Sequence, residues 1–540
     1  MELFKRNRIS EISDRRSRFA TWAVRRTVLG VSVIALVAAT GITSLSSNGA
    51  NAASTKRGGT LTIASLAPTT LNPALNPDAA PEEWYADLAY EPLMVLAKSG
   101  LKLSPGLAVK WGFIGTGNKV FQMTLRSGVE FSNGQKLTAK GVVAFLKYFE
   151  KNGVSGTEFF GGSTITATGP LTVRIHLAVA DADLPLRFAN YANNSEWVIA
   201  PAGIAHPKSL GNVTLGAGPY VLDSKASVSN STYVYTANKR FFDQAAIHWN
   251  KIIVKVVGDE SSTLAALESG QVQVAEGSTT DAAAAKSAGL SVVGVPVGAY
   301  GIIVTDPTGS IVPALGNLEV REALAYAIDR PAIAQAVFGS YATSPGQVAD
   351  KAIPGYLPSL DKAFAYNPTK AKQLLTEAGY PNGFSLTLLT SPQIGLATMM
   401  QAVASDWAAI GVTLTIDNPG QATWLNQFLT VQYPLSALGL SYSLTPDLVS
   451  QFFSPNSAED NGKYPFTTLT QLWNRYNTAP VGSKASVAVQ TKMNQYLTNQ
   501  VMWIFVASPD FMWFVRPGVA GISANPAWPI SDPVDWYSTK

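Results

Sequence analysis

Residues 121–152 read FQMTLRSGVEFSNGQKLTAKGVVAFLKYFEKN and combine two periodicities in one stretch. Apolar and polar residues alternate over 121–127, which is typical of a half-buried strand. From 138 to 152 the apolar side chains recur at helical spacing, and Thr138 stands where a helix N-cap is expected. A strand followed closely by an amphipathic helix predicts a mixed α/β fold.

The rest of the chain repeats this alternation of strand and helix patterns. Alternating or densely apolar runs predict strands, and helical spacing that opens on Asn-Pro or closes on Gly predicts helices. The expected strands are 60–65, 171–177, 220–224, 231–238, 247–258, 384–390 and 412–417. The expected helices are a short one closed by Gly270, one or two over 320–339, and those over 367–380 and 396–411. A chain of 540 residues with no single winding order is expected to form two lobes.

Composition excludes several classes of protein. The chain has no cysteine, which excludes a disulfide scaffold, a thiolate zinc site and a cysteine nucleophile. Only 14% of the residues are charged, but the many aromatic residues argue against disorder. The formal charge of +4 originates in residues 1–52, which hold eight basic and three acidic residues. The remaining 32 basic and 33 acidic residues balance, so no nucleic acid is expected as a partner.

The first 52 residues have the three parts of a secretory signal peptide. A basic segment ends at Arg25-Arg26, an uncharged and mostly apolar run covers 27–45, and small residues around Ala50-Asn51-Ala52 follow. We therefore expect cleavage after Ala52, with the mature chain at the periplasmic or extracellular face of the cell membrane. The alternative is a retained anchor helix, because nineteen uncharged residues can just span a bilayer core of about 30 Å. The arginine pair is compatible with twin-arginine export and with general export.

Motifs for catalysis and for metal binding are scarce. The three histidines (His176, His206 and His248) are scattered, and no H-x-x-x-H pair exists. The chain has no G-x-S-x-G elbow and no G-x-x-x-x-G-K-[ST] phosphate loop. Adjacent acids such as Glu82-Glu83 diverge on a helix or strand, so they are poor candidates for facing carboxylates. An exported α/β protein without these motifs favours binding over catalysis, with no cofactor and no metal.

Several aromatic residues stand in segments that resemble loops. Trp84 and Tyr85 follow a stretch rich in Pro and Ala, Trp424 follows Asn418-Pro419-Gly420, and Tyr442 lies in a short polar run. Each of these rings alone is more typical of a core residue. Aromatic side chains on loops between two lobes also suit a concave site for a mostly uncharged ligand.

The order of these elements resembles the extracellular solute-binding proteins of the oligopeptide/dipeptide/nickel class, family 5, which serve ABC importers. Five blocks spread over nearly the whole mature chain carry the resemblance: GGTLTIA…LNPAL (58–75), FQMTLRSGVEFSNGQKLTAKGVV (121–143), GAGPYVLDS (216–224), VREALAYAIDRPAIAQAVFG (320–339) and YNPTKAKQLLTEAGYPNGF (366–384). In the second block, Asn133 and Lys140 stand where acids are usual in the family.

The resemblance implies a two-lobed type II periplasmic-binding-protein fold with an extra subdomain inserted in the first lobe. The ligand is expected between lobes that close on it. The implied divisions are a signal peptide at 1–52, first-lobe segments at 53–85, 205–300 and 505–540, the inserted subdomain at 86–204, and the second lobe at 301–504.

The resemblance also implies a ligand site. In peptide-binding members, a G-W-x-x-D segment after a Trp-bearing helix supplies an Asp that pairs with the α-amine of the peptide. Here Trp424 is retained, Leu440 replaces the family Trp, and Ser443 replaces the Asp. A serine hydroxyl does not supply the charge that anchors an ammonium group. The predicted ligand-binding residues are Glu82, Trp84, Tyr85, Trp424, Leu440, Ser441, Tyr442 and Ser443. Asp447, four residues after Ser443, is a candidate for a shifted substitute, but the preceding Pro446 is more typical of a turn.

These observations lead to one function and its alternatives. The expected protein is a monomeric, non-enzymatic receptor that captures a small molecule or oligopeptide, mostly uncharged, and delivers it to an ABC permease with its ATPase subunits. Membrane association is expected only through the permease or through an uncleaved leader. The alternatives are a ligand-sensing subunit of a membrane signalling receptor, a receptor for an oligosaccharide in place of a peptide, and a secreted hydrolase.

Overall fold

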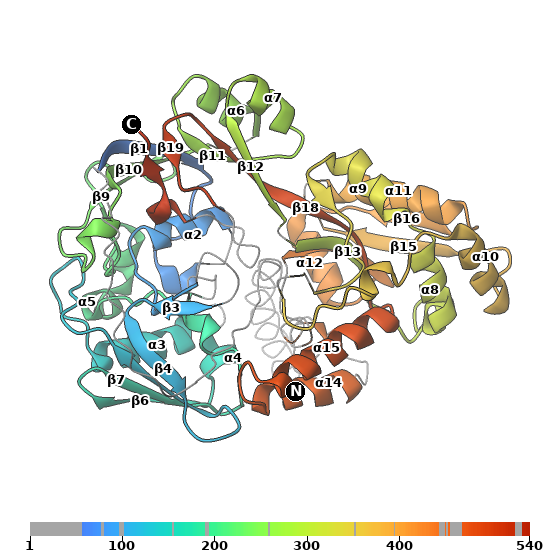
Figure 1. Ribbon diagram of the computed structural model, residues 1–540, viewed down its shortest axis with the longest axis horizontal. Coiled ribbons are helices and arrows are strands. Elements are labelled where there is room, and N and C mark those ends of the chain that lie inside the picture. The colour runs from blue at the N-terminus through green and yellow to red at the C-terminus, as the bar shows by residue number, and fades with distance from the viewer. Residues whose placement is uncertain are drawn as a thin grey trace, which may run out of the picture.

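The computed structural model has two lobes that lie side by side and are joined by strands of one large sheet (Figure 1). The structure describes residues 57–76, 80–96, 102–153, 156–189, 194–257, 260–296, 298–349, 351, 353–391, 393, 395–441, 446, 449, 452–453, 467–523 and 532–540. The expected leader therefore lies outside the described residues.

Twelve of the described strands form the large sheet. Its main path runs, in order, through β16 (Thr413–Asp417), β15 (Ser385–Thr390), β17 (Leu435–Ser441), β13 (Gly298–Val304), β18 (Trp503–Val515), β11 (Val274–Gly277), β1 (Gly58–Ser65), β10 (Trp249–Val256), β9 (Thr232–Ala237) and β8 (Tyr220–Leu222). Two further strands, β12 (Ser291–Pro296) and β14 (Ala342–Thr343), pair with β18. Parallel pairs (β1 with β10 and with β11, β15 with β16 and with β17) lie on both sides of β18, which itself pairs antiparallel.

Strand β18 connects the two lobes. Its first residues, Trp503 to Ala507, pair with β13 in the second lobe. Its later residues, Asp510 to Val515, pair with β12 in the first lobe. Since β12 and β13 follow each other in the chain, the lobes are joined by two neighbouring strand segments, an arrangement that permits hinge motion.

A separate antiparallel sheet forms the inserted part of the first lobe. Its order is β4 (Ala108–Phe113), β5 (Val120–Leu125), β7 (Thr172–His176) and β6 (Thr164–Gly169), and helix α3 (Ala139–Asn152) packs on it. Alternate side chains of β5 are buried, as the period-2 pattern of 121–127 predicts. The Thr138 side chain accepts a hydrogen bond from the Gly141 amide at 3.1 Å, so the predicted N-cap of α3 is confirmed.

The remaining helices surround the sheets. In the first lobe they are α2 (Ala80–Asp87), α4 (Gly156–Phe160), α5 (Pro201–Ala205), α6 (Glu260–Glu268) and α7 (Ala282–Ser287). In the second lobe they are α8 (Leu318–Tyr326), α9 (Arg330–Phe338), α10 (Pro368–Glu377), α11 (Leu396–Ala408), α12 (Gln421–Leu429), α14 (Thr467–Thr478) and α15 (Lys484–Asn499). Two small antiparallel sheets have two strands each: β2 (Met94–Leu96) with β3 (Leu103–Pro105), and β19 (Val519–Ala520) with β20 (Tyr537–Ser538).

The helix and strand predictions agree closely with these elements. The segment 320–339 forms two helices, because the side chain of Asp329 accepts a hydrogen bond from the Ala332 amide and caps α9. The side chain of Asn367 caps α10 in the same way through the Lys370 amide. Gly270, Gly339 and Gly379 have positive φ angles just after their helices, where glycine is favoured. Within the described ranges, no helix has both the length and the apolar character needed to cross a membrane.

The expectation that Trp84 and Trp424 lie on loops is wrong, because both residues are helical. Trp84 and Tyr85 are in α2, where Pro81 occupies the first turn, a position that proline tolerates. Trp424 is in α12, which begins directly after Gly420 as N-cap and contains no Gly or Pro. Preceding Pro and Gly residues therefore mark helix starts here. Tyr442 lies outside the described residues.

Candidate functional site

The junction of the two lobes is the place where the ligand site is predicted. Beside the connecting strands, the Asp510 amide of β18 donates to the carbonyl of Tyr341, which precedes β14, at 2.8 Å. The Lys286 ammonium of α7 lies 5.1 Å from the centre of the Tyr341 ring. The cation–π contact joins α7 of the first lobe to the residue that precedes β14, beside the paired strands.

The predicted residues of the first lobe lie in its hydrophobic core. The Trp84 side chain is 1% exposed, and its ring stacks on Trp513 of β18 at a centroid distance of 4.8 Å. Trp536 meets Trp84 edge to face at 5.6 Å. The hydroxyl of the buried Tyr85 donates to the Leu66 carbonyl at 2.8 Å. Of Glu82, only the place in α2 is described. These contacts place Trp84 directly against a strand that connects the lobes, and ligand contact by these residues stays a prediction.

The predicted residues of the second lobe are only partly described. Trp424 is buried and stacks on Phe428 at 5.4 Å, with the two rings nearly parallel. Leu440 and Ser441 end β17, where they pair with the backbone of β13. Tyr442 and Ser443, like Asp447, lie outside the described residues. The structure therefore places the beginning of the predicted segment at the end of β17, beside β13 at the lobe junction.

Sequence patterns did not predict three side chains near this segment, those of Gln393, Tyr300 and Glu276. The Gln393 amide group accepts a hydrogen bond from the Gly439 amide at 2.5 Å and donates to the Gly439 carbonyl at 3.3 Å. A Cβ atom at Gly439 would lie 2.2 Å from the Tyr300 ring, so only glycine fits there. Burial, and secondly the charge of Glu276, raises the pKa of Tyr300 to about 12. Tyr300 is in β13 and Glu276 in β11, so the charge of an acid in the first lobe acts on a hydroxyl group at the junction.

No local sequence signal places Tyr300 or Gln393 at the junction. Tyr300, Gln393 and Gly439 belong to segments far apart in the chain. The pairing of β13 with β17 brings Tyr300 and Gly439 together, and the pairing of β15 with β17 brings the segment of Gln393 beside them. Glycine inside a strand pattern is a sign of close approach by another group, and Gly439 is such a case.

A cavity of about 730 Å³ lies within the first lobe. Its walls include Asp87 and Glu91, whose pKa values burial raises to about 8. The next largest cause is the charge of Glu196 for Asp87 and that of Asp532 for Glu91. Asp87 also accepts a hydrogen bond from the Trp197 indole at 3.2 Å. We assign this cavity no ligand, because none of the predicted site residues lines it and the Asp87 carboxylate already accepts a hydrogen bond from Trp197.

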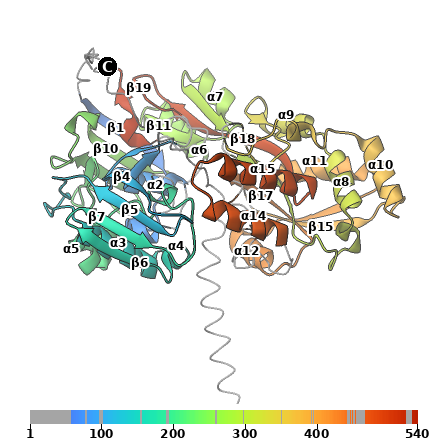
Figure 2. The same cartoon turned by 60° about the horizontal axis from the view of Figure 1, so that its bottom comes forward.

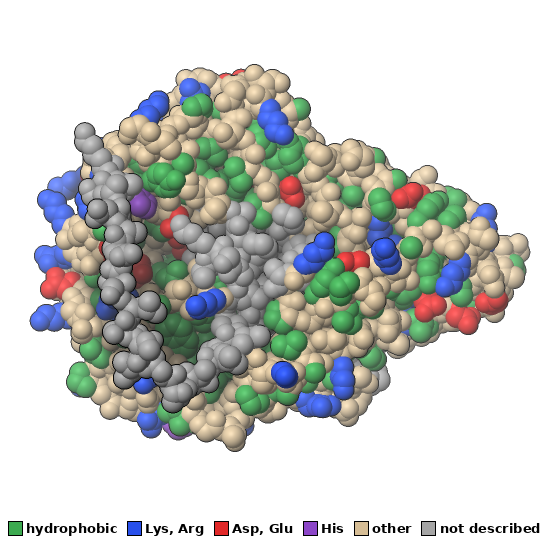
Figure 3. Space-filling model, in the orientation of Figure 1, with side chains coloured by type: hydrophobic (Ala, Val, Ile, Leu, Met, Phe, Trp, Pro, Cys, Tyr) green, Lys and Arg blue, Asp and Glu red, His purple; other side chains and the backbone are tan. Residues whose placement is uncertain are grey.

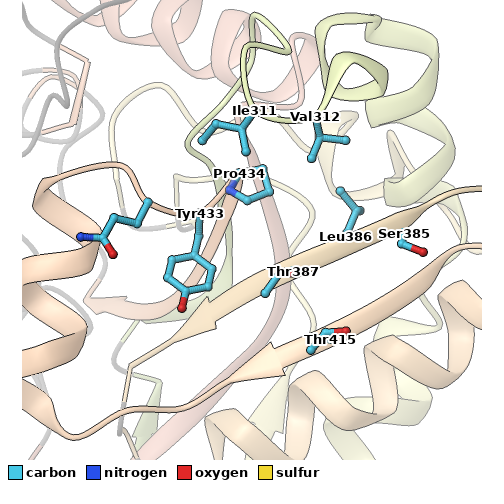
Figure 4. Close-up of a pocket in the computed structure, with 9 residues that line it drawn as sticks. Ile311, Val312, Ser385, Leu386, Thr387, Thr415, Tyr433 and Pro434 are labelled. Carbon is cyan, nitrogen blue, oxygen red and sulfur yellow. The ribbon is translucent and has the colours of Figure 1, made fainter.

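A groove of about 420 Å³ lies at the outer edge of the second lobe (Figure 4). It is lined by Leu386 of β15, Thr415 of the edge strand β16, Ile311 and Tyr433. The Tyr433 hydroxyl donates to the Asp417 carboxylate. None of the predicted site residues lines this groove, and it is separate from the junction with the first lobe. On the face drawn in Figure 3, basic and acidic side chains are scattered over both lobes, without one extended field of a single sign.

Sequence comparisons find a family and several relatives. The profile of the bacterial extracellular solute-binding proteins, family 5 Middle, matches residues 102–462. The glutathione-binding protein GsiB of Salmonella paratyphi A is 30% identical over 421 residues, which are 74% of this chain and 76% of that protein. The protein of that name from Escherichia coli O1:K1 is 29% identical over 302 residues. This second match spans 54% of this chain and 56% of the relative, about half the length of each.

Solved structures show the same fold. HbpA2 from Haemophilus parasuis superposes with a TM-score of 0.77 at 20% identity, covering 89% of this chain and 100% of that chain. The periplasmic binding protein DppA from Helicobacter pylori, in complex with the peptide STSA, gives a TM-score of 0.73 at 18% identity, covering 90% and 99%. The predicted two-lobed, type II periplasmic-binding-protein fold is confirmed by this likeness and by the α/β architecture.

Proposed function

Because the chain belongs to family 5 of the bacterial extracellular solute-binding proteins, we propose that it captures a small solute between its lobes and delivers it to the permease of an ABC importer. The observation that carries this proposal is the connection through β18 and the β12–β13 segment. Two adjacent strand segments permit one lobe to rotate toward the other, and a closed pair of lobes is a distinct shape for a permease to recognise. The proposed receptor is monomeric and acts outside the cytoplasm.

The proposed ligand is peptide-like or another small, mostly uncharged solute. Peptide-like ligands are supported by relatives named for glutathione and by the fold shared with a protein solved with a bound peptide. Ser443 stands where the resemblance implies an Asp in peptide-binding members, and a hydroxyl does not neutralise a buried ammonium group. We therefore favour a solute that brings no unpaired ammonium group to this position.

Ligand binding by the mature chain tests the function. Glutathione, the dipeptide Met-Leu and an oligosaccharide such as maltotriose are offered at increasing concentrations, and the melting temperature and radius of gyration are measured. A true ligand at a hundredfold excess over its Kd stabilises the folded state by about 2.7 kcal/mol. Ligand binding is also expected to lower the radius of gyration, because the population shifts toward joined lobes. The two-lobed clamp would be contradicted by a ligand that raises the melting temperature and leaves the radius of gyration unchanged. This result would have to hold both in this chain and in variants whose contacts between the lobes are weakened.

We propose that Ser443 lies close to the bound solute. A carboxylate introduced by Ser443→Asp is then buried without a partner, so affinity for the natural ligand falls, and affinity for free-amine peptides rises. Ser287→Asp on the exposed face of α7 is the matched control and is expected to leave affinity unchanged. Isothermal titration calorimetry measures both. Equal affinity of wild type and Ser443→Asp for every solute would show that the segment does not line the site.

A further inference from the structure

The C-terminal end of α14 contacts the inserted subdomain on the side of the molecule away from the connecting strands (Figures 1 and 2). The Asn118 side-chain amide, in the turn between β4 and β5, donates to two carbonyls of the second lobe. The acceptors are Asn477 at 2.9 Å and Ala479 at 2.6 Å. One side chain of the first lobe therefore reaches the last turn of a helix in the second lobe.

The C-terminal end of a helix offers carbonyl groups that can accept these hydrogen bonds. The last carbonyls of a helix have no donor within the helix and take one from another source. Asn118 has a φ angle of +49°, a left-handed conformation that asparagine adopts more readily than most residues. The neighbouring Gly115 and Gly117 also have positive φ angles. The shape of this turn presents the Asn118 amide to α14.

A second segment of the subdomain meets the same helix end. The hydroxyl of the buried Tyr476 donates to the Asp183 carboxylate at 2.5 Å. The Ala182 amide donates to the Asn477 side-chain oxygen at 3.1 Å, and the Ala182 side chain is buried in the hydrophobic cluster of the second lobe. These contacts are desolvated, so breaking them exposes polar groups and apolar surface together.

The segment that carries Ala182 and Asp183 is held firmly by its own subdomain. Arg187 forms an ion pair with Asp181 at 2.6 Å, and its guanidinium lies 4.1 Å from the centre of the Phe159 ring. The Asp183 amide also donates to the Asp181 carboxylate at 2.9 Å. The docking groups are therefore positioned before they meet α14, and less conformational entropy is lost on contact.

We propose that Asn118, Ala182, Asp183, Tyr476 and Asn477 form a latch that holds the two lobes together on the side opposite the hinge. Rotation about the connecting strands separates both sides of the latch at once, so all four hydrogen bonds break in one step. A typical hydrogen bond shifts an equilibrium about fivefold, so each hydrogen bond of the latch that is removed shifts the population toward separated lobes by about that factor. The latch thereby sets how readily a bound solute is released. The inserted subdomain, which contains none of the predicted ligand-binding residues, gains a role in closure.

The latch is tested by measuring the distance between the lobes directly. The chain has no cysteine, so Thr168→Cys and Lys484→Cys, both at exposed positions of opposite lobes, take spin labels without background. Pulsed electron paramagnetic resonance then gives the distance distribution of the chain without added solute. In the latch variant, Asn118→Gly keeps the positive φ angle while removing the amide, and Tyr476→Phe removes only the hydroxyl. We expect the long-distance population to rise at least fivefold relative to wild type.

Two matched substitutions serve as the control variant. Asn230→Gly replaces another asparagine with a positive φ angle on an exposed turn of the first lobe. Tyr433→Phe removes a tyrosine–aspartate hydrogen bond within the second lobe. The control is expected to retain the wild-type distances. Folding of every variant is checked by circular dichroism, and Tyr476→Phe is also measured alone in case the double variant does not fold.

The latch proposal would be overturned if the latch variant folded and kept the wild-type distances. If only Tyr476→Phe folds, unchanged distances in that variant would overturn the proposal equally. The same holds if the control variant opens equally. Since no solute is added, this result is independent of which ligand the protein binds. A chain that binds none of the offered solutes can still show the latch, and a chain without the latch can still be an importer receptor.

Discussion

Buried polar groups distinguish the first lobe from an ordinary apolar core. Trp84, Trp536 and Trp513 of β18 form a cluster of mutually contacting rings. The indole nitrogens of Trp84 and Trp513 have no hydrogen-bond partner among the described residues. Close by in the chain, Asp87 keeps a carboxyl group inside the lobe. Such groups are costly to bury, and they make stability sensitive to pH.

The buried Asp87 is predicted to make the protein less stable as pH rises. Burial and the charge of Glu196 raise the pKa of Asp87 to about 8, so the folded state binds the proton more tightly than the unfolded state does. The contribution of this group is fully present below the unfolded pKa, near 4, and is lost as pH rises through about 8. Its share of the slope is at most about 1.4 kcal/mol per pH unit.

Urea unfolding at several pH values between 5 and 8 measures this effect. Asp87→Asn is expected to flatten the fall in the free energy of unfolding over this range, because an amide does not titrate. Glu268→Gln, at an exposed position of α6, is the control for removing one acid. An identical slope for wild type and Asp87→Asn would show that this carboxyl does not carry the pH dependence.

Among the elements, α3 shows how a capping residue that can be predicted from the sequence stabilises a helix. The Thr138 side chain satisfies one of the amide groups that every helix leaves unpaired at its start. Thr138→Ala is therefore expected to cost about 1 kcal/mol of stability, measured by thermal or urea unfolding. Thr138→Ser retains the hydroxyl and should remain close to wild type. If both substitutions destabilise the protein equally, the methyl group matters and the hydrogen bond does not.

Strand β18 is the element that unites the molecule. Its residues from Trp503 to Val515 are almost entirely buried, which is typical of a central strand covered on both faces. It pairs with β13 on one side of the junction and with β12 and β11 on the other. Its two apolar runs, residues 503–507 and 511–515, are separated by Ser508-Pro509-Asp510, and they favour buried strands without specifying the neighbours of those strands.

For the molecule as a whole, the first 52 residues predict export and cleavage. The basic segment, the apolar run and Ala50-Asn51-Ala52 predict cleavage after Ala52. Intact-mass spectrometry of the exported protein is expected to show a mature N-terminus at Ala53. Retention of Met1 would instead support a signal anchor, and replacing Ala52 by a bulky residue is the control that should block cleavage.

Local patterns were sufficient for part of the elements and for the family, but they did not indicate the strands at the junction of the lobes, β12, β13, β17 and β18. The strand at 121–127, the helix at 138–152 and the caps Thr138 and Asn367 could be read directly, since a period and a cap depend only on neighbouring residues. The five ordered blocks were sufficient to recognise family 5, and the family implied the two-lobed fold. Local patterns place Trp84 and Trp424 on loops, and this prediction is wrong because a preceding Pro or Gly marks a turn and a helix start equally well.

Contacts between distant segments required the folded chain. Asn118 and Asn477 are 359 positions apart, and nothing near either residue indicates that one will cap the helix of the other. The same holds for Tyr300 and Gly439, which meet because β13 pairs with β17. Such contacts arise when the packing of whole elements brings their ends together, and the free energy of that packing is summed over the entire core. Periodicity describes which face of an element is buried, while the partner of that face is selected only by the assembled lobes.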